Sequence, residues 1–295
     1  MSGADSTAYD AGTVPRCYRH ADRETYISCQ RCGRPICPDC MMQASVGFHC
    51  PECVREGRAT SPQARTSFGG KVSDGSSIVT VALIAVNALV FVLALATGGG
   101  NGAFATTLAL MPDSSQWPPR FGLEGVAQGS YWQLVTSTFL HVEVLHIALN
   151  MIGLWIFGTF LESQLGRWRY LALYLVTGLV GSVAVYWLAP LGSLSYGASG
   201  SVFGLFGAAL VVLLKQKRDV SQLLLLLGLN LVITFTVGNI SWQAHLGGLA
   251  AGLAMGAGFA YAPRARRTTL HVGMTAALVA LGVVLVVLRS AALPA

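Results

Sequence analysis

Seven apolar runs, each about as long as a bilayer is thick, constrain the fold of this chain more than any other feature. About 20 helical residues cross the hydrocarbon core of a membrane. Runs of that length cover residues 77–97, 143–162, 168–190, 197–214, 221–238, 242–261 and 271–288. Of the 295 residues, 53% are hydrophobic and only 11% are charged, which is too apolar for an ordinary soluble domain. The sequence therefore predicts an all-α polytopic membrane protein, with the broken segment 98–132 half-embedded.

Lysine and arginine residues indicate the orientation of these spans. Beyond the linker that precedes the first span, they cluster after the second, fourth and sixth spans, as Arg167 and Arg169, Lys215, Lys217 and Arg218, and Arg264, Arg266 and Arg267. Basic residues favour the cytoplasmic side of a membrane. We therefore expect a multi-pass protein of the cell membrane with a cytoplasmic N-terminus and an extracytoplasmic C-terminus. The net charge of +6 is then a topology signal, and nucleic acid is not an expected partner.

A serine and a histidine occupy matching places in two of the spans. Gly197-Ala198-Ser199-Gly200 opens the fourth run, and His245 lies just inside the sixth. Both runs cross in the same direction, so the two side chains should lie at similar depth, near the extracytoplasmic face. Small residues four apart follow each of them and favour close helix approach, namely Gly200 and Gly204, and Gly248, Gly252 and Gly256. The pattern predicts hydrolysis by a serine nucleophile, although helix packing alone also explains the glycines.

Polar side chains in the second span suggest a further part of such a site. His146 and Asn150 are four apart on one helix face, with His141 one turn outside. Because polar groups are costly in a membrane, they face a partner or a cavity. One interpretation is hydrogen bonding to neighbouring helices. The other is that they donate to the oxyanion of an acyl-transfer reaction.

Taken together, these motifs resemble the rhomboid intramembrane serine proteases over residues 77–262. The combination is His146-x-x-x-Asn150, Gly197-x-Ser199-Gly200 and Ala244-His245-x-x-Gly248, in this order. The resemblance implies a six-helix core plus one extra C-terminal transmembrane helix. It also implies an extracytoplasmic opening of the active site and no cofactor for catalysis.

The resemblance assigns roles to individual residues. Ser199 would be the nucleophile and His245 the general base, as a dyad without a carboxylate. His146, Asn150 and the Ser199 backbone N–H would form the oxyanion hole. Three residues would support the site: Gly197 by keeping access open, Phe203 by stacking on His245 where the family often has tyrosine, and His141 by holding water or substrate at the mouth. For His141, a merely interfacial role is an equal alternative.

One departure concerns the segment before the second span. The chain has Trp132-Gln133 where the family usually has Trp-Arg, so we expect a less stable first loop. The predicted function is an endopeptidase that cuts peptide bonds in or next to transmembrane helices of other proteins in the bilayer. The alternatives are an inactive relative that binds membrane helices, and a transporter or channel that uses the same polar residues.

Seven cysteines and a histidine near the N-terminus form a separate pattern. The ligand candidates come as four pairs with two residues between their members: Cys17 and His20, Cys29 and Cys32, Cys37 and Cys40, Cys50 and Cys53. Such pairs are typical of zinc sites, and so short a segment needs metal to fold. The short gap between Cys32 and Cys37 favours interleaving, with the first and third pairs at one zinc and the second and fourth at the other. The segment resembles B-box zinc fingers.

Alternatives remain for this segment. His49 could replace Cys50 as a ligand, and a disulfide framework is disfavoured by the odd number of cysteines and the expected cytoplasmic side. A protein partner is the expected role. The predicted organisation is a disordered N-terminus (1–16), a zinc-binding domain (17–53), a linker (54–76), the six-helix core (77–262) and a seventh transmembrane helix with a tail (263–295).

Overall fold

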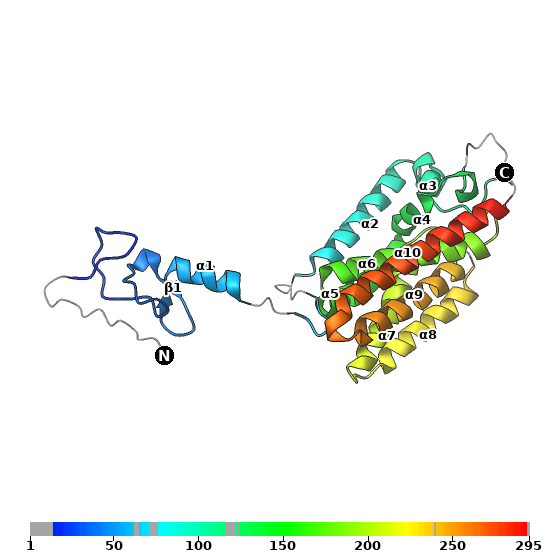
Figure 1. Cartoon of the computed structure of the whole chain (residues 1–295). Coiled ribbons are helices and arrows are strands. Elements are labelled where there is room, and N and C mark those ends of the chain that lie inside the picture. Colours follow the sequence, from blue (N-terminus) through cyan, green and yellow to red (C-terminus); the bar gives the residue numbers. More distant parts are fainter. Residues whose placement is uncertain are drawn as a thin grey trace. The chain divides into compact units, whose positions relative to one another are not determined.

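The chain divides into two compact units, Met1–Gln63 and Ala64–Ala295 (Figure 1). The computed structural model describes residues 14–61, 65–70, 76–115, 122, 124–238 and 240–293. Most of the predicted disordered N-terminus, residues 1–13, lies outside the described residues. Residues 14–16 belong to the small unit, where the Pro15 carbonyl accepts a hydrogen bond from the Thr25 N–H.

The N-terminal unit has little regular structure and a core made largely of cysteine. It contains the turn η1 (Pro38–Cys40), the antiparallel hairpin β1 (Met42–Gln43) and β2 (Phe48–His49), and helix α1 (Pro51–Thr60). Its buried hydrophobic cluster consists of Ile36 and six of the cysteines. Helix α1 begins naturally at Pro51, because proline suits the first helical turn and the Cys50 sulfur accepts the Cys53 N–H. The first seven residues of the predicted linker are thus helical.

The larger unit is a helical bundle whose long helices match the predicted spans. These are α2 (Ile78–Ala96), α5 (Val144–Leu165), α6 (Arg167–Leu188), α7 (Ser199–Lys215), α8 (Ser221–Thr236), α9 (Trp242–Tyr261) and α10 (Arg267–Ala292). Among the described residues, α2, α5, α6 and the stretch Arg264–Ala292 are long and apolar enough to cross a membrane by length and composition. Helices α7 and α8 are apolar but shorter, and α9 is rich in glycine and alanine.

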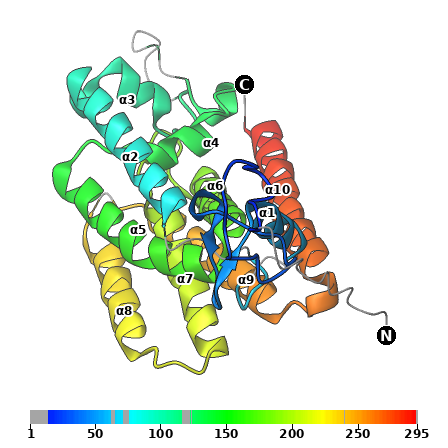
Figure 2. The same cartoon turned by 90° about the vertical axis from the view of Figure 1, so that its left-hand side faces the viewer.

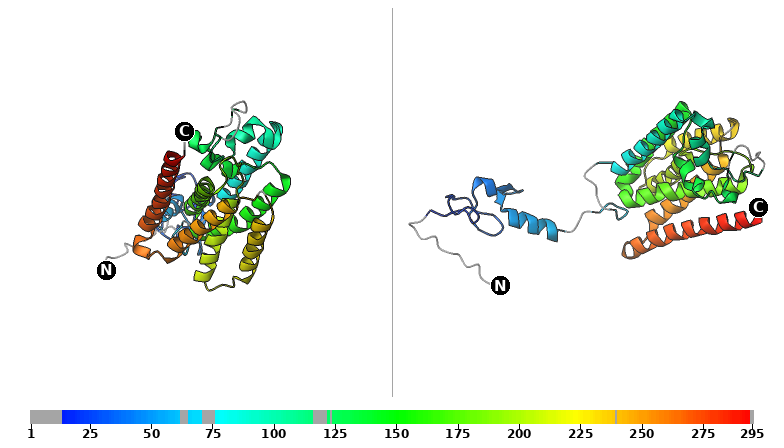
Figure 3. Two further views of the ribbon diagram at one scale, coloured as in Figure 1. Left: turned by 90° about the vertical axis from the view of Figure 1, so that its right-hand side faces the viewer. Right: turned by 90° about the horizontal axis from the view of Figure 1, so that it is seen from above.

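Helix α7 is largely buried among its neighbours, whereas α8 lies at the edge of the bundle (Figures 2 and 3). Helices α5, α6 and α9 pack around α7, and α10 lies along α6 and α9. The core includes the fully buried Tyr170, Tyr174 and Met255. By contrast, α8 leaves large apolar side chains such as Leu225 and Phe235 exposed, as expected of a surface that faces lipid.

A carboxylate fastens the first long helix to the bundle. Glu162, buried near the end of α5, accepts hydrogen bonds from the N–H groups of Val79 and Thr80 at 3.1 and 2.9 Å, and from the Thr80 hydroxyl at 2.9 Å. The first turn of a helix has N–H groups without intrahelical partners, and an anion is favoured there. Glu162 of α5 therefore caps the N-terminus of α2.

The last part of the predicted linker packs on this unit. The Ser67 carbonyl accepts a hydrogen bond from Arg267, which follows the turn η6 (Arg264–Arg266), at 3.0 Å. Gly70 lies so close to the Leu165 carbonyl that a β-carbon there would overlap it. Residues 65–70 therefore belong to the helical unit.

Short helices fill the segment between α2 and α5: η2 (Gly99–Asn101), α3 (Ala103–Leu108), η4 (Val126–Gln128), α4 (Gln133–Thr136) and η5 (Ser137–Phe139). The Gln133 side chain is buried and bridges two distant parts of this loop. Its Oε1 accepts the Met111 N–H at 3.0 Å, and its Nε2 donates to the Glu124 carbonyl at 2.8 Å. The amide therefore ties together the loop that we expected to be weakened by the missing arginine.

Candidate active site

Ser199 is the first residue of α7, and the segment before it is held in an extended path. Leu110 and Ser195 exchange two backbone hydrogen bonds of 2.9 Å each, which pairs the loop after α3 with this segment. The Gly197 N–H donates to the Ser137 carbonyl at 2.9 Å. Gly197 has φ of +126°, a conformation that side chains rarely adopt. The strand-to-helix turn thus places the partly exposed Ser199 at the beginning of the helix.

Two histidines pack against this turn. The His146 ring lies on Gly197, where a β-carbon would come within 2.7 Å of its Cε1 and Nε2 atoms. His141 is fully buried, and its Nε2 accepts the Ala198 N–H at 3.3 Å. The two imidazole centroids are 5.0 Å apart, edge to face. His141 therefore supports the turn before Ser199 from inside the protein, whereas we had expected it at the mouth of the site.

Glycines bring the backbones of α7 and α9 into contact beside the two predicted catalytic residues. A β-carbon on Gly248 would overlap the Gly200 carbonyl, and one on Gly252 would overlap the Gly204 carbonyl. A β-carbon on Gly200 would come within 3.2 Å of the Ala244 carbonyl. Since Gly200 follows Ser199 and Ala244 precedes His245, this contact brings the backbones of α7 and α9 together next to the serine and the histidine.

The His245 ring is fixed by two contacts. Phe203 stacks on it with ring centroids 4.1 Å apart and an angle of 14° between the planes, in the arrangement that we predicted. The Thr234 hydroxyl of α8 lies 2.7 Å from the ring Nδ1. Among the described residues, the structure records no hydrogen bond between the Ser199 hydroxyl and the ring. Such bonds often form only with substrate present.

Sequence reasoning did not identify Thr234. The side chain is buried and its hydroxyl also bonds the Asn230 carbonyl one turn earlier, at 2.7 Å. Threonines in membrane helices commonly make that bond to their own helix, so the residue looks structural. The sequence signal for a role of Thr234 is its place near the end of α8, the helix that precedes the span with His245.

Asn150, the second side chain predicted to donate to the oxyanion, already uses one of its N–H groups in another hydrogen bond. Asn150 is buried on α5, and its Nδ2 donates to the His146 carbonyl at 3.0 Å. A side-chain amide has two N–H donors, so one remains after this bond. Thus α5 supplies His146 and Asn150, α7 supplies Ser199 and α9 supplies His245.

The N-terminal unit brings its eight predicted ligands together in two groups. Cys17, His20, Cys37 and Cys40 form one, and Cys29, Cys32, Cys50 and Cys53 form the other. In the first group the His20 Nδ1 lies 3.8, 3.3 and 3.5 Å from the three sulfurs. Tetrahedral bonds of about 2.3 Å to sulfur and about 2.0 Å to nitrogen separate ligand atoms by about 3.5–3.8 Å. The groups can therefore hold metal ions in the interleaved pairing, with Cys50 inside its group and His49 on β2.

The surroundings of the sulfurs shift their pKa values in both directions. Burial, beside other sulfurs, raises the pKa of Cys40 to about 11 and that of Cys53 to about 12. Each group also contains a sulfur whose surroundings favour the thiolate. Burial acts to raise the pKa of Cys17, but backbone hydrogen bonds from Cys37, Arg19 and His20 outweigh it and lower that pKa to about 6. In the second group, the Cys50 N–H donates to the Cys29 sulfur at 3.2 Å, and Arg34 Nε donates to the Cys32 sulfur at 3.3 Å. A divalent metal binds thiolates, so both groups suit one.

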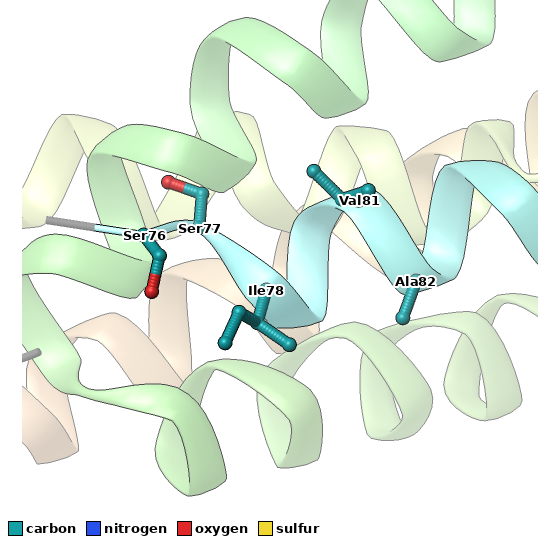
Figure 4. A pocket seen from close by; sticks show the side chains of 5 residues that line it. All are labelled: Ser76, Ser77, Ile78, Val81 and Ala82. Carbon is teal, nitrogen blue, oxygen red and sulfur yellow. The ribbon is translucent and has the colours of Figure 1, made fainter. Parts of the chain in front are cut away.

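A pocket lies at the beginning of α2. It is lined by Ser76, Ser77, Ile78, Val81 and Ala82 (Figure 4). None of the residues assigned to the candidate active site contributes to it. We therefore assign no chemistry to this pocket.

Comparison with known proteins agrees with this geometry. The sequence model of the Rhomboid domain matches residues 128–262. The chain is 32% identical over 195 residues to "Rhomboid protease GluP" of Bacillus subtilis, covering 64% of this chain and 36% of that protein. It is 35% identical over 133 residues to "Putative rhomboid protease YdcA" of the same organism, covering 43% and 67%. It is 37% identical over 140 residues to "RHOMBOID-like protein 6, mitochondrial" of Arabidopsis thaliana, covering 44% and 45%.

Proposed function

Because the chain belongs to the rhomboid family, we propose that it is an intramembrane serine endopeptidase whose dyad is Ser199 and His245. The observation that carries this proposal is the contact of α7 with α9. It brings the two helix backbones together next to the serine and the histidine, and Phe203 stacks on the imidazole. The presence of Ser199, His245, His146 and Asn150 argues against an inactive relative, because such a relative would lack one of these residues.

The proposed reaction has two steps. The Ser199 oxygen attacks the carbonyl carbon of the peptide bond while its proton passes to His245 Nε2. The amine product then leaves with that proton. Water, activated by His245 in the same way, hydrolyses the acyl-enzyme and restores the serine. During both steps the Ser199 N–H, His146 and the free N–H of Asn150 would stabilise the oxyanion, an effect worth on the order of 100-fold in rate for each donor.

The proposed substrates are transmembrane helices of other proteins. The bundle carries membrane-length apolar helices, so a protein substrate would meet the site from within the bilayer. Such a helix must unwind before its peptide bond is accessible, since every backbone group in lipid is otherwise paired. We propose the orientation given by the basic clusters, with the N-terminus cytoplasmic and the site open on the other side.

The proposal is tested by replacing single serines of α7. Ser199→Ala should abolish cleavage of a model transmembrane substrate and labelling by a fluorophosphonate probe, and His245→Ala should do the same. Ser201→Ala is the matched control, because Ser201 lies two residues away and donates to the Tyr174 carbonyl at 2.9 Å. It should retain cleavage. Cleavage that persists in folded Ser199→Ala would refute the dyad.

We also propose that the two cysteine groups each hold one structural Zn²⁺, and that the N-terminal unit serves as a docking module for a protein partner. The metal assignment rests on the ligand spacing and chemistry of both groups. Elemental analysis of the purified chain should then give about two zinc ions per molecule. A folded unit without metal would contradict it.

A further inference from the structure

The imidazole of His245 has a partner that the proposed dyad does not include. Thr234 is buried in the last turn of α8, and its Oγ1 lies 2.7 Å from His245 Nδ1. The same oxygen lies 2.7 Å from the Asn230 carbonyl oxygen of its own helix. The O···O distance is ordinary for a hydroxyl donor and the N···O distance lies at the short end of the normal range, so both contacts are well formed. The hydroxyl therefore stands between a carbonyl and the ring.

The number of protons decides which way each bond runs. A carbonyl oxygen can only accept, and a threonine hydroxyl has a single proton to donate. That proton goes to the Asn230 carbonyl. The Thr234 oxygen must then accept from the ring, which assigns the proton of neutral His245 to Nδ1. The lone pair consequently lies on Nε2, the nitrogen that must receive the Ser199 proton.

We propose that Thr234 is a positioning residue that holds His245 in the Nδ1–H tautomer and in the orientation needed to act as a base toward Ser199. This inference rests on the proposed function. When the Ser199 proton reaches Nε2, the Nδ1–H bond to Thr234 remains and gains strength, because hydrogen bonds from a charged donor are stronger. A neutral hydroxyl from a third helix thus performs the orienting task that an aspartate performs in a serine–histidine–aspartate triad.

The surroundings explain why a hydroxyl suits this position. The Thr234 and His245 side chains are both buried, so a carboxylate at position 234 would place a charge in a poorly solvated site. Phe203 restrains only the plane of the ring by stacking on its face. Rotation within that plane, and the choice of tautomer, require a directional partner. Thr234 supplies it through the Asn230 carbonyl, which fixes the direction of the hydroxyl.

The test compares hydroxyl and methyl groups on one helix. Thr234→Val keeps the shape and removes the acceptor, and Thr234→Ser restores the acceptor. Thr236→Val is the matched control, because Thr236 is exposed on the same helix and bonds only the Val232 carbonyl of its own turn. We expect Thr234→Val to lower kcat about 10-fold with KM nearly unchanged. Thr234→Ser and Thr236→Val should each stay within about 2-fold of the parent protein.

Three outcomes separate the possibilities. Equal kcat in Thr234→Val and Thr236→Val would overturn the role of Thr234 and leave the dyad intact. A serine variant as slow as the valine variant would also overturn it, since bulk rather than hydrogen bonding would then matter. Persistent cleavage in Ser199→Ala would instead refute the proposed function.

A spectroscopic measurement does not depend on turnover or on the folding of the Thr234 variants. Nitrogen-15 spectra of histidine-labelled protein distinguish the two neutral tautomers, and loss of a signal in His245→Asn assigns the ring. The Nδ1–H form is expected in the parent protein at neutral pH. An Nε2–H form would overturn the inference.

Discussion

The two units of this chain are stabilised by different means. In the N-terminal unit the buried side chains are almost all cysteines, grouped around positions where a metal can bind. In the helical unit, α7 and α9 meet through glycine, backbone against backbone. The helical unit also has an extended apolar core, which the small unit lacks. The small unit has too few residues for one, and lipid offers helices little hydrophobic gain from association.

Because the two units are stabilised differently, different treatments should disrupt their folded structures. If the proposed metal assignment holds, the folding of the N-terminal unit depends on an ion from outside the chain and is reversed by chelation. The α7–α9 contact depends on the absence of side chains and can be changed only by substitution. Three experiments probe this contrast, in order of decreasing effect.

Metal removal should have the largest effect. Structural zinc contributes on the order of 10 kcal/mol to the folding of small domains, more than such a unit can otherwise supply. A chelator, or Cys37→Ser, should abolish amide hydrogen-exchange protection over residues 14–61 and leave the helical unit protected. His49→Ala is the control, because His49 lies outside both groups. Unchanged protection after chelation would show that the two units are stabilised more alike than we infer.

A side chain in the α7–α9 contact should have the next largest effect. Gly252→Val would force a branched side chain into the Gly204 carbonyl, and we expect a loss of about 3 kcal/mol or more. The thermal midpoint should fall and cleavage should be lost, since Ser199 and His245 would separate. Gly228→Val on α8 is the control, because nothing lies within 4 Å of a β-carbon there. Equal midpoints for the two variants would contradict the proposed role of backbone contact.

Removal of the loop bridge should have the smallest effect. Gln133→Ala leaves the buried Met111 N–H and the Glu124 carbonyl without their partner, at a cost of about 1–3 kcal/mol. We expect faster proteolysis between α2 and α5 and a lower thermal midpoint. Gln216→Ala, which removes a single bond to the Gln164 side chain, should change little. A loop as resistant in Gln133→Ala as in the parent protein would mean that other contacts hold it.

Much of the helical unit could be predicted, because its helices and their close contacts follow from patterns within short stretches of sequence. Each apolar run became a helix, since a chain in lipid must pair its backbone groups internally. The Gly200–Gly248 contact also followed from the spacing of small residues. The stacking of Phe203 on His245 came from the family resemblance.

The features that were not predicted depend mostly on contacts between residues that are distant in sequence. The part of α1 after residue 53 was interpreted as linker because residues 54–76 are basic and without periodicity, although Pro51 marks the beginning of the helix. Gln133 was expected to weaken the loop because it stands where the family usually has arginine. Its two bonds were not foreseen, because they reach backbone groups 22 and nine residues away. Thr234 was missed because its bond to His245 needs the three-dimensional path between α8 and α9.

Gly197 has a consequence for the genetics of this protein. Any other residue there meets two separate obstacles, a backbone conformation with φ of +126° and the His146 ring against its β-carbon. A smaller residue at position 146 would relieve the second obstacle and leave the first. A selection for recovered activity that starts from a substituted Gly197 should therefore return the original glycine codon, and second-site suppressors should be absent.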